Sequence, residues 1–198
     1  MDKLEVCNMA LARIGATPIM SLTEESEEAR RVEQFYVHDR RIVLRRYPWP
    51  WAMRRAELTQ LETTPEDFAY AYRYPANCVC LRKLYSVDED GHYMPFPDFV
   101  TYQMTSDATG KILNTNEPRV AAEYTLDLED NSIMDEMFAD ALTWKLAASV
   151  AFKLTGNAQI VQMSISEYER IFSEALSDAE NEQNLKVPEL NTFIRARF

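Results

Sequence analysis

Residues 40–56 read RRIVLRRYPWPWAMRRA, a stretch in which a helical pattern runs into two prolines that alternate with two tryptophans. Each proline lacks an N–H and disfavours helix in the residue before it, so a helix is predicted to end near Tyr47. Trp49 and Trp51 follow, and rings of that size contribute strongly to a core or an interface. We expect this corner to anchor the fold, together with Arg40 and Trp144.

Helical patterns flank the corner on both sides. Asp2 and Glu5 form a predicted capping box ahead of a first helix, which Gly15 ends in the left-handed conformation. A second helix is predicted from about Thr23 to Tyr47, with acids in its first turn and arginines in its last, as the helix dipole favours. A third helix, predicted to open at Ser132, is apolar almost all round and is expected to be the central buried one. A fourth runs to about residue 181 and carries an acidic outer face.

Arg40 interrupts the apolar stripe of the second helix. We favour a fringe position, in which the aliphatic stem packs and the guanidinium reaches water. The alternative is a buried ion pair with an acid on a neighbouring helix, for which Asp140 is a candidate.

The middle of the chain changes to a strand pattern. Residues 68–74 alternate with period two and place four aromatic rings on one face. Further strands are predicted between turn sequences, at 79–87, 99–105, 111–113 and 119–126. We interpret this region as one small antiparallel sheet. Its aromatic face is typical of a core, and few basic residues accompany it, which argues against a base-stacking platform.

The composition is that of a globular protein. The 198 residues are 46% hydrophobic, and no apolar run approaches the ~20 residues of a membrane-spanning helix. No secretory signal is visible at the start, so we expect folding in a cytoplasm. Cys7, Cys78 and Cys80 are too few for a disulfide framework, and the two histidines have no second ligand at a usable spacing. We therefore predict no metal site.

Charge is unevenly distributed. The chain carries a net charge of −11, of which residues 1–58 contribute +1 and residues 59–198 contribute −12. Affinity for a phosphate backbone needs clustered positive charge, so the acidic excess argues against it. Such a surface is compatible with DNA that passes without binding.

The last stretch of the chain is too short and interrupted for a core, yet it is more apolar than a frayed terminus. We predict that it docks on a partner through Leu185, Val187, Leu190, Phe193, Ile194, Arg195, Arg197 and Phe198.

These patterns together predict an α+β protein, mainly α, with four helices, an inserted small antiparallel β domain and an extended C-terminal tail. The packing of the helices into a four-helix bundle core is an expectation from the family resemblance described below. The predicted parts are residues 1–56, with helices 1 and 2 and the Pro-Trp corner; 57–131, the β domain; 132–183, with helices 3 and 4; and 184–198, the docking tail.

The chain resembles the tail tubular protein A family, the head-to-tail adaptors (connectors) of short-tailed phages. The match runs from about residue 4 to about residue 183. It is carried at the start of the chain by Asn8, Ala10, Leu11, Ile14, Gly15, Ile19, Ser21 and Leu22, and then by Ala29, Arg40, Leu44 and Arg45. It continues through Pro48-Trp49-Pro50-Trp51-Ala52, Arg55-Ala56-x-Leu58 and Tyr70-Ala71-Tyr72-Arg73-Tyr74-Pro75-Ala76-Asn77-Cys78. Trp51 stands where the family commonly has Phe, and Asn77 where it commonly has Asp.

The resemblance implies a helical bundle with a β insertion, assembled as a dodecameric ring around a DNA channel in the virion. It implies a portal protein above, a tail nozzle or tail tube protein below, and neither catalysis nor a cofactor. In this family the apolar tail is expected to dock on the portal, and the subunits assemble in the host cytoplasm.

Two other function classes remain as alternatives. One is a nucleic-acid-binding module that uses Arg30, Arg31, Arg41 and Arg45 of the second helix, against which the interspersed glutamates and the net charge weigh. The other is an enzyme with paired carboxylates at Asp127, Glu129 and Asp130, although acids before a helix usually cap it and face solvent.

Overall fold

The computed structural model describes residues 1–63, 65–97, 100–128 and 133–182. The helices within these residues are α1 (Lys3–Arg13), α2 (Glu27–Arg46), α3 (Glu136–Thr155) and α4 (Ala158–Glu182), and a 3-10 turn, η1, covers Pro50–Ala52. The strands are β1 (Met53–Glu57), β2 (Tyr70–Arg73), β3 (Cys78–Val87), β4 (Tyr93–Pro95), β5 (Tyr102–Asp107), β6 (Gly110–Thr115) and β7 (Val120–Leu126). The chain is therefore an α+β protein, and the predicted docking tail lies outside the described residues.

Local chemistry sets the helix ends. The capping box of α1 is confirmed, since the Asp2 side chain accepts from the Glu5 N–H and the Glu5 side chain accepts from the Asp2 N–H. Helix α2 ends at Arg46, and Tyr47 is extended because Pro48 follows it. The prediction that α3 opens at Ser132 is wrong. Its N-cap is Asp135, whose carboxylate accepts from the N–H groups of residues 137 and 138.

Helix α3 lies at the centre of the helices and contacts α1, α2 and α4. Buried side chains occur on every side of it rather than along one stripe, as expected for a helix with three helical neighbours. They are Phe138, Ala139, Ala141, Leu142, Thr143, Leu146, Ala147, Val150 and Ala151. The central position predicted for this helix is confirmed.

The strands form two antiparallel sheets, where the sequence predicted one. The first has the order β1-β7-β3-β4 and the second the order β2-β6-β5. Strand β1 follows the Pro-Trp corner directly and crosses the predicted domain boundary at residue 56. The sequence analysis missed this strand because MRRAE is basic and lacks the usual strand pattern. The three-residue β4 was also missed. Predicted strand 99–105 begins at Tyr102 instead, and residue 99 is not among the described residues.

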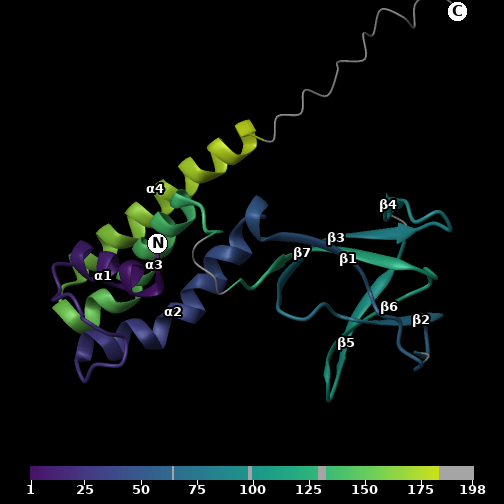
Figure 1. Cartoon of the computed structure of the whole chain (residues 1–198), viewed down its shortest axis with the longest axis horizontal. Coiled ribbons are helices and arrows are strands. Elements are labelled where there is room, and N and C mark those ends of the chain that lie inside the picture. The colour runs from purple at the N-terminus through teal and green to yellow at the C-terminus, as the bar shows by residue number, and fades with distance from the viewer. Residues whose placement is uncertain (64, 98–99, 129–132, 183–198) are drawn as a thin grey trace, which may run out of the picture.

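The helices and the sheets occupy opposite ends of the molecule, and α2 leads from one to the other (Figure 1). Each end has its own apolar core. The sheet core includes Tyr72, which is fully buried and donates its hydroxyl proton to the Glu117 carbonyl at 2.8 Å. None of the described helices combines the length and the apolar character needed to cross a bilayer.

Candidate functional site

The C-terminal half of α2 meets the sheets at a junction in which Arg82 of β3 is central. The Arg82 Nη2 donates to the carbonyls of Leu44, Arg45 and Tyr47 at 2.9, 3.0 and 2.9 Å, and its Nε donates to Thr125 Oγ1 at 2.9 Å. The last carbonyls of a helix have no partner within the helix. Arg82 therefore caps α2 from the sheet and links the two ends of the molecule.

A buried ion pair strengthens the same junction and corrects the expectation for Arg40. The Arg40 side chain is only 3% exposed, so its guanidinium does not reach water as we favoured. Its Nη2 donates to Asp127 Oδ1 at 2.6 Å, while the exposed Arg41 donates its Nε to Asp127 Oδ2 at 2.7 Å. Asp140, the candidate partner, pairs with Arg13 instead. Asp127 follows β7, so the pair joins α2 to the first sheet.

The Pro-Trp corner lies beside this junction. The Trp49 ring is buried and meets Tyr47, Phe138 and Phe172 edge to face, and its Nε1 donates to the Val43 carbonyl at 3.1 Å. Trp51 is half-buried, and its ring stacks edge-on against Phe138. These contacts bring α2, α3 and α4 together at one point.

Trp144 lies elsewhere in the helical end. It is half-buried, and the Arg13 guanidinium lies over its ring at 4.4 Å from the centroid. Because Arg13 also pairs with Asp140, this contact joins α1 to α3.

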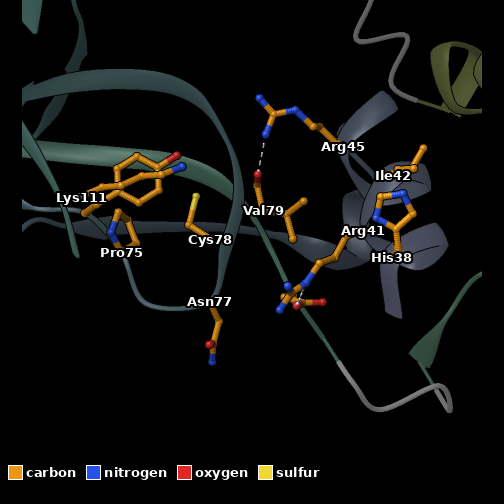
Figure 2. A pocket seen from close by; sticks show the side chains of 11 residues that line it. His38, Arg41, Ile42, Arg45, Pro75, Asn77, Cys78, Val79 and Lys111 are labelled. Atoms are coloured by element: carbon orange, nitrogen blue, oxygen red, sulfur yellow. Dashed lines mark hydrogen bonds and ion pairs between the residues drawn. The ribbon is translucent and has the colours of Figure 1, made fainter. Parts of the chain in front are cut away.

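A groove of about 560 Å³ runs along the outside of the junction. Figure 2 shows Arg41 and Arg45 extending from α2 on one side of it, with Lys111, Pro75 and Cys78 on the other. The Arg45 Nη1 donates across the groove to the Val79 carbonyl at 3.0 Å. The full lining comprises His38, Arg41, Ile42, Arg45, Tyr74, Pro75, Asn77, Cys78, Val79, Lys111 and Asp127.

The chemistry of this groove favours binding an anion over nucleophilic catalysis. Burial raises the pKa of the Cys78 thiol, so the thiol is protonated at neutral pH and is a poor nucleophile. Burial likewise raises the pKa of the Tyr74 hydroxyl above its ordinary value. Asp127, the acid in the lining, is engaged by both Arg40 and Arg41, so the lining as a whole is positively charged.

A possible cation site escaped the sequence analysis. Asp88, Asp90 and His92 lie in the turn between β3 and β4, and their potential ligand atoms are within 4.8 Å of one another. The statement that His92 has no second ligand at a usable spacing is therefore wrong. The missed signal was the Asp-x-Asp-x-His spacing in a turn. However, both carboxylate oxygens of Asp88 already contact His92. Oδ1 accepts from the backbone N–H of His92, and Oδ2 lies 3.1 Å from its ring Nδ1.

The arginines proposed for nucleic-acid binding are largely engaged within the chain. Arg30 and Arg31 both pair with Glu27, and Arg41 pairs with Asp127. Of the enzyme alternative's acids, Asp127 is held between two arginines, while Glu129 and Asp130 lie outside the described residues. Neither arrangement favours the alternative function.

Comparisons with known proteins add no further assignment. No protein-family model matches the chain, and a search of curated proteins finds no match.

Proposed function

We propose that this protein is a structural head-to-tail adaptor of a phage virion, not an enzyme. Many copies form a ring, a dodecamer in the family that the chain resembles, below the portal. The ring joins the head to the tail nozzle or tail tube and lets the genomic DNA pass. The subunits assemble in the host cytoplasm, and the four helices form the bundle core of each one.

The observation that carries the proposal is the set of contacts that joins two separate ends of the molecule. Arg82, the Arg40–Asp127 pair and the Pro-Trp corner hold the helices and the sheets in a fixed relation. Several of these residues, Arg40 and Trp49 among them, are also those that carry the resemblance. A protein that joins two partners presents two separate surfaces, and contacts that link the two ends of the molecule support that role.

Exposed apolar side chains at both ends support the same proposal. Exposed apolar groups of this size are available for contacts with partners, and each end of the molecule carries several of them. On the sheets they are Tyr93, Met94, Tyr102 and Met104, and on α3 and α4 they are Phe152, Met163 and Ile165. The acidic excess of residues 59–198 suits a channel wall that DNA does not stick to.

The test is the mass of the purified protein in solution, measured by light scattering alone and then with its portal. A ring-sized species in either condition supports the adaptor. A monomer in both conditions, even at high concentration, contradicts it.

A truncation separates the portal contact from the fold. Deleting residues 185–198 is expected to leave the melting temperature unchanged and to abolish portal binding. Loss of soluble folded protein would show that the tail belongs to the fold, and full portal binding would show that it is not the docking segment.

A further inference from the structure

The groove at the junction contains cations that have no acidic partner among the described residues. Most described lysines and arginines pair with an acid. Those with no acidic ion-pair partner among the described residues are Arg45, Arg54, Arg82, Lys83, Lys111 and Lys153. Two of them, Arg45 and Lys111, line the groove from opposite sides. In a chain of net charge −11, this is a place where an acidic group is attracted.

Three of the acids that make no ion pair with described residues lie close together in the sequence between β1 and β2. Glu62, Glu66 and Asp67, named here the acidic loop, are exposed and make no ion pair with described residues. Half-buried apolar residues accompany them, namely Leu61, Pro65 and Phe68. The groove combines the complementary features, because Ile42, Pro75 and Val79 lie among its cations.

The groove and the acidic loop lie at opposite ends of β2. Residues 59–61 run antiparallel to β2, since the Leu61 N–H donates to the Ala71 carbonyl and the Arg73 N–H donates to the Thr59 carbonyl. The acidic loop therefore returns to the start of β2, near Tyr70, whereas the groove is lined by Tyr74 and Pro75 just after its end. Four residues of strand span roughly 13 Å. This separation keeps the loop out of the groove of its own chain.

We propose that the groove of one copy binds the acidic loop of a second copy. Two different surfaces that meet in this way make a head-to-tail contact, and such contacts close into a ring when the rotation between copies permits. Lys111 and Arg45 of one copy would pair with the carboxylates of the acidic loop of the other copy. The apolar residues of that loop would pack on the apolar residues of the groove. The inference rests on the proposed function, for which it names the contact between subunits.

Charge reversal tests the contact on the full chain, in whichever condition yields the oligomer, alone or with the portal. Lys111→Glu is the first variant, because the exposed ammonium donates no hydrogen bond to a described residue and its contact is with the Tyr74 ring, 5.3 Å away at the centroid. Lys111→Glu with Arg45→Glu is the second. Each should raise the concentration for half-assembly, tenfold or more for the pair, because like charges then face each other. Glu62→Lys with Glu66→Lys should do the same.

Recovery of assembly when both partners of the contact are reversed is a more specific test than weakening by a single reversal. Combining the groove reversal with the loop reversal in one chain recreates opposite charges at every contact, and so does mixing the two variants. Either should return the half-assembly concentration to within about threefold of the wild type, and the wild-type contact should weaken with added salt. Lys153→Glu and Lys83→Glu are the matched controls, since they add the same charge at exposed lysines that have no acidic partner among the described residues and do not line the groove.

The outcomes separate the two proposals. A wild-type oligomer that the groove reversals weaken no more than the controls do would overturn the inference and leave the adaptor standing. Weakening without restoration in the charge swap would also overturn it. A wild type that stays monomeric alone and with the portal would overturn both. Melting curves of every variant identify any that fails to fold. If the double variant fails to fold, the effect of the exposed Lys111→Glu variant on assembly decides whether the inference stands.

Discussion

At the scale of single residues, burial decides what each charge contributes. Arg40 and Arg41 bind the same carboxylate, yet the Arg40 side chain is 3% exposed and the Arg41 side chain 60% exposed. A buried ion pair is costly to break because it leaves a charge without solvent, whereas an exposed arginine is readily replaced by water. The two neighbours should therefore differ sharply when each is removed.

We expect Arg40→Ala to lower the free energy of unfolding by about 3–5 kcal/mol and Arg41→Ala by about 0–1 kcal/mol. Urea denaturation measures both, and urea, being uncharged, does not screen the pair. Equal losses would show that Asp127 is held equally by the two arginines and would contradict the burial argument.

The two corner tryptophans should also differ. The Trp49 ring is buried with its N–H bonded, so Trp49→Ala should cost about 3–5 kcal/mol. The Trp51 N–H is buried with no acceptor among the described residues. Trp51→Phe removes that unpaired donor and keeps a ring against Phe138, so stability should stay within about 1 kcal/mol or rise. Thermal melting compares them, and a large loss in Trp51→Phe would mean that the N–H has a partner.

Asp39 of α2 gives the stability a pH dependence. Its carboxylate is fully buried and accepts no hydrogen bond from described residues, while Lys145 Nζ lies 3.6 Å away. Burial raises the pKa of Asp39 above its ordinary value of 3.8, and the nearby Ser149 hydroxyl and Lys145 ammonium offset this only in part.

The direction in which stability changes with pH depends on whether the folded or the unfolded chain keeps the Asp39 proton. Just above pH 3.8 the folded chain still binds the Asp39 proton that the unfolded chain has released, so this residue lowers stability as the pH rises from there to its folded pKa. Asp39→Asn should remove that decline. The measurement is urea stability from pH 4 to pH 7 in both proteins, and identical slopes would contradict the assignment.

At the scale of elements, the end of α2 depends on a strand far away in the sequence. Pro48 stops the helix, but the carbonyls left over are satisfied by Arg82 of β3. The capping residue thus comes from the sheet and not from the chain that follows the helix. Helix and sheet should accordingly lose stability together.

Arg82→Met keeps much of the side-chain volume and removes the donors, so it should cost about 2 kcal/mol or more. Hydrogen exchange should quicken in the last turn of α2. Lys83→Met is the matched control on the next, exposed position and should change stability by no more than about 0.5 kcal/mol. Comparable losses in the two variants would show that the cap does not stabilise the junction.

At the scale of the whole molecule, the distribution of charge separates an adaptor from a nucleic-acid-binding module. The arginines of α2 are largely paired within the chain, and the chain as a whole is strongly acidic. A protein that neutralises DNA phosphates binds more tightly as salt is lowered. An adaptor lining a channel should show no such behaviour.

We therefore expect no retardation of duplex DNA in a gel at any salt concentration, down to about 10 mM, where charges act over the longest range. A retarded band that disappears with added salt would favour the nucleic-acid-binding alternative. Arg45→Glu with Lys111→Glu would then show whether the groove is responsible.

The sequence by itself determined the features that neighbouring residues control. The capping box at Asp2 and Glu5, the end of α2 before Pro48 and the α+β class all follow from backbone chemistry and hydrophobic periodicity, which act over a few residues. The sequence also predicted the central position of α3, because a helix that is apolar all round must be covered on all sides.

Only the tertiary structure decided which distant groups meet. Asp127 lies 87 positions from Arg40, and the cap of α2 comes from Arg82 more than thirty positions away. The division into two sheets and the groove between Arg45 and Lys111 depend in the same way on how strands pair across the chain. Such contacts are selected by the packing of the whole molecule, since many residues could offer the same charge and only the fold brings one pair together.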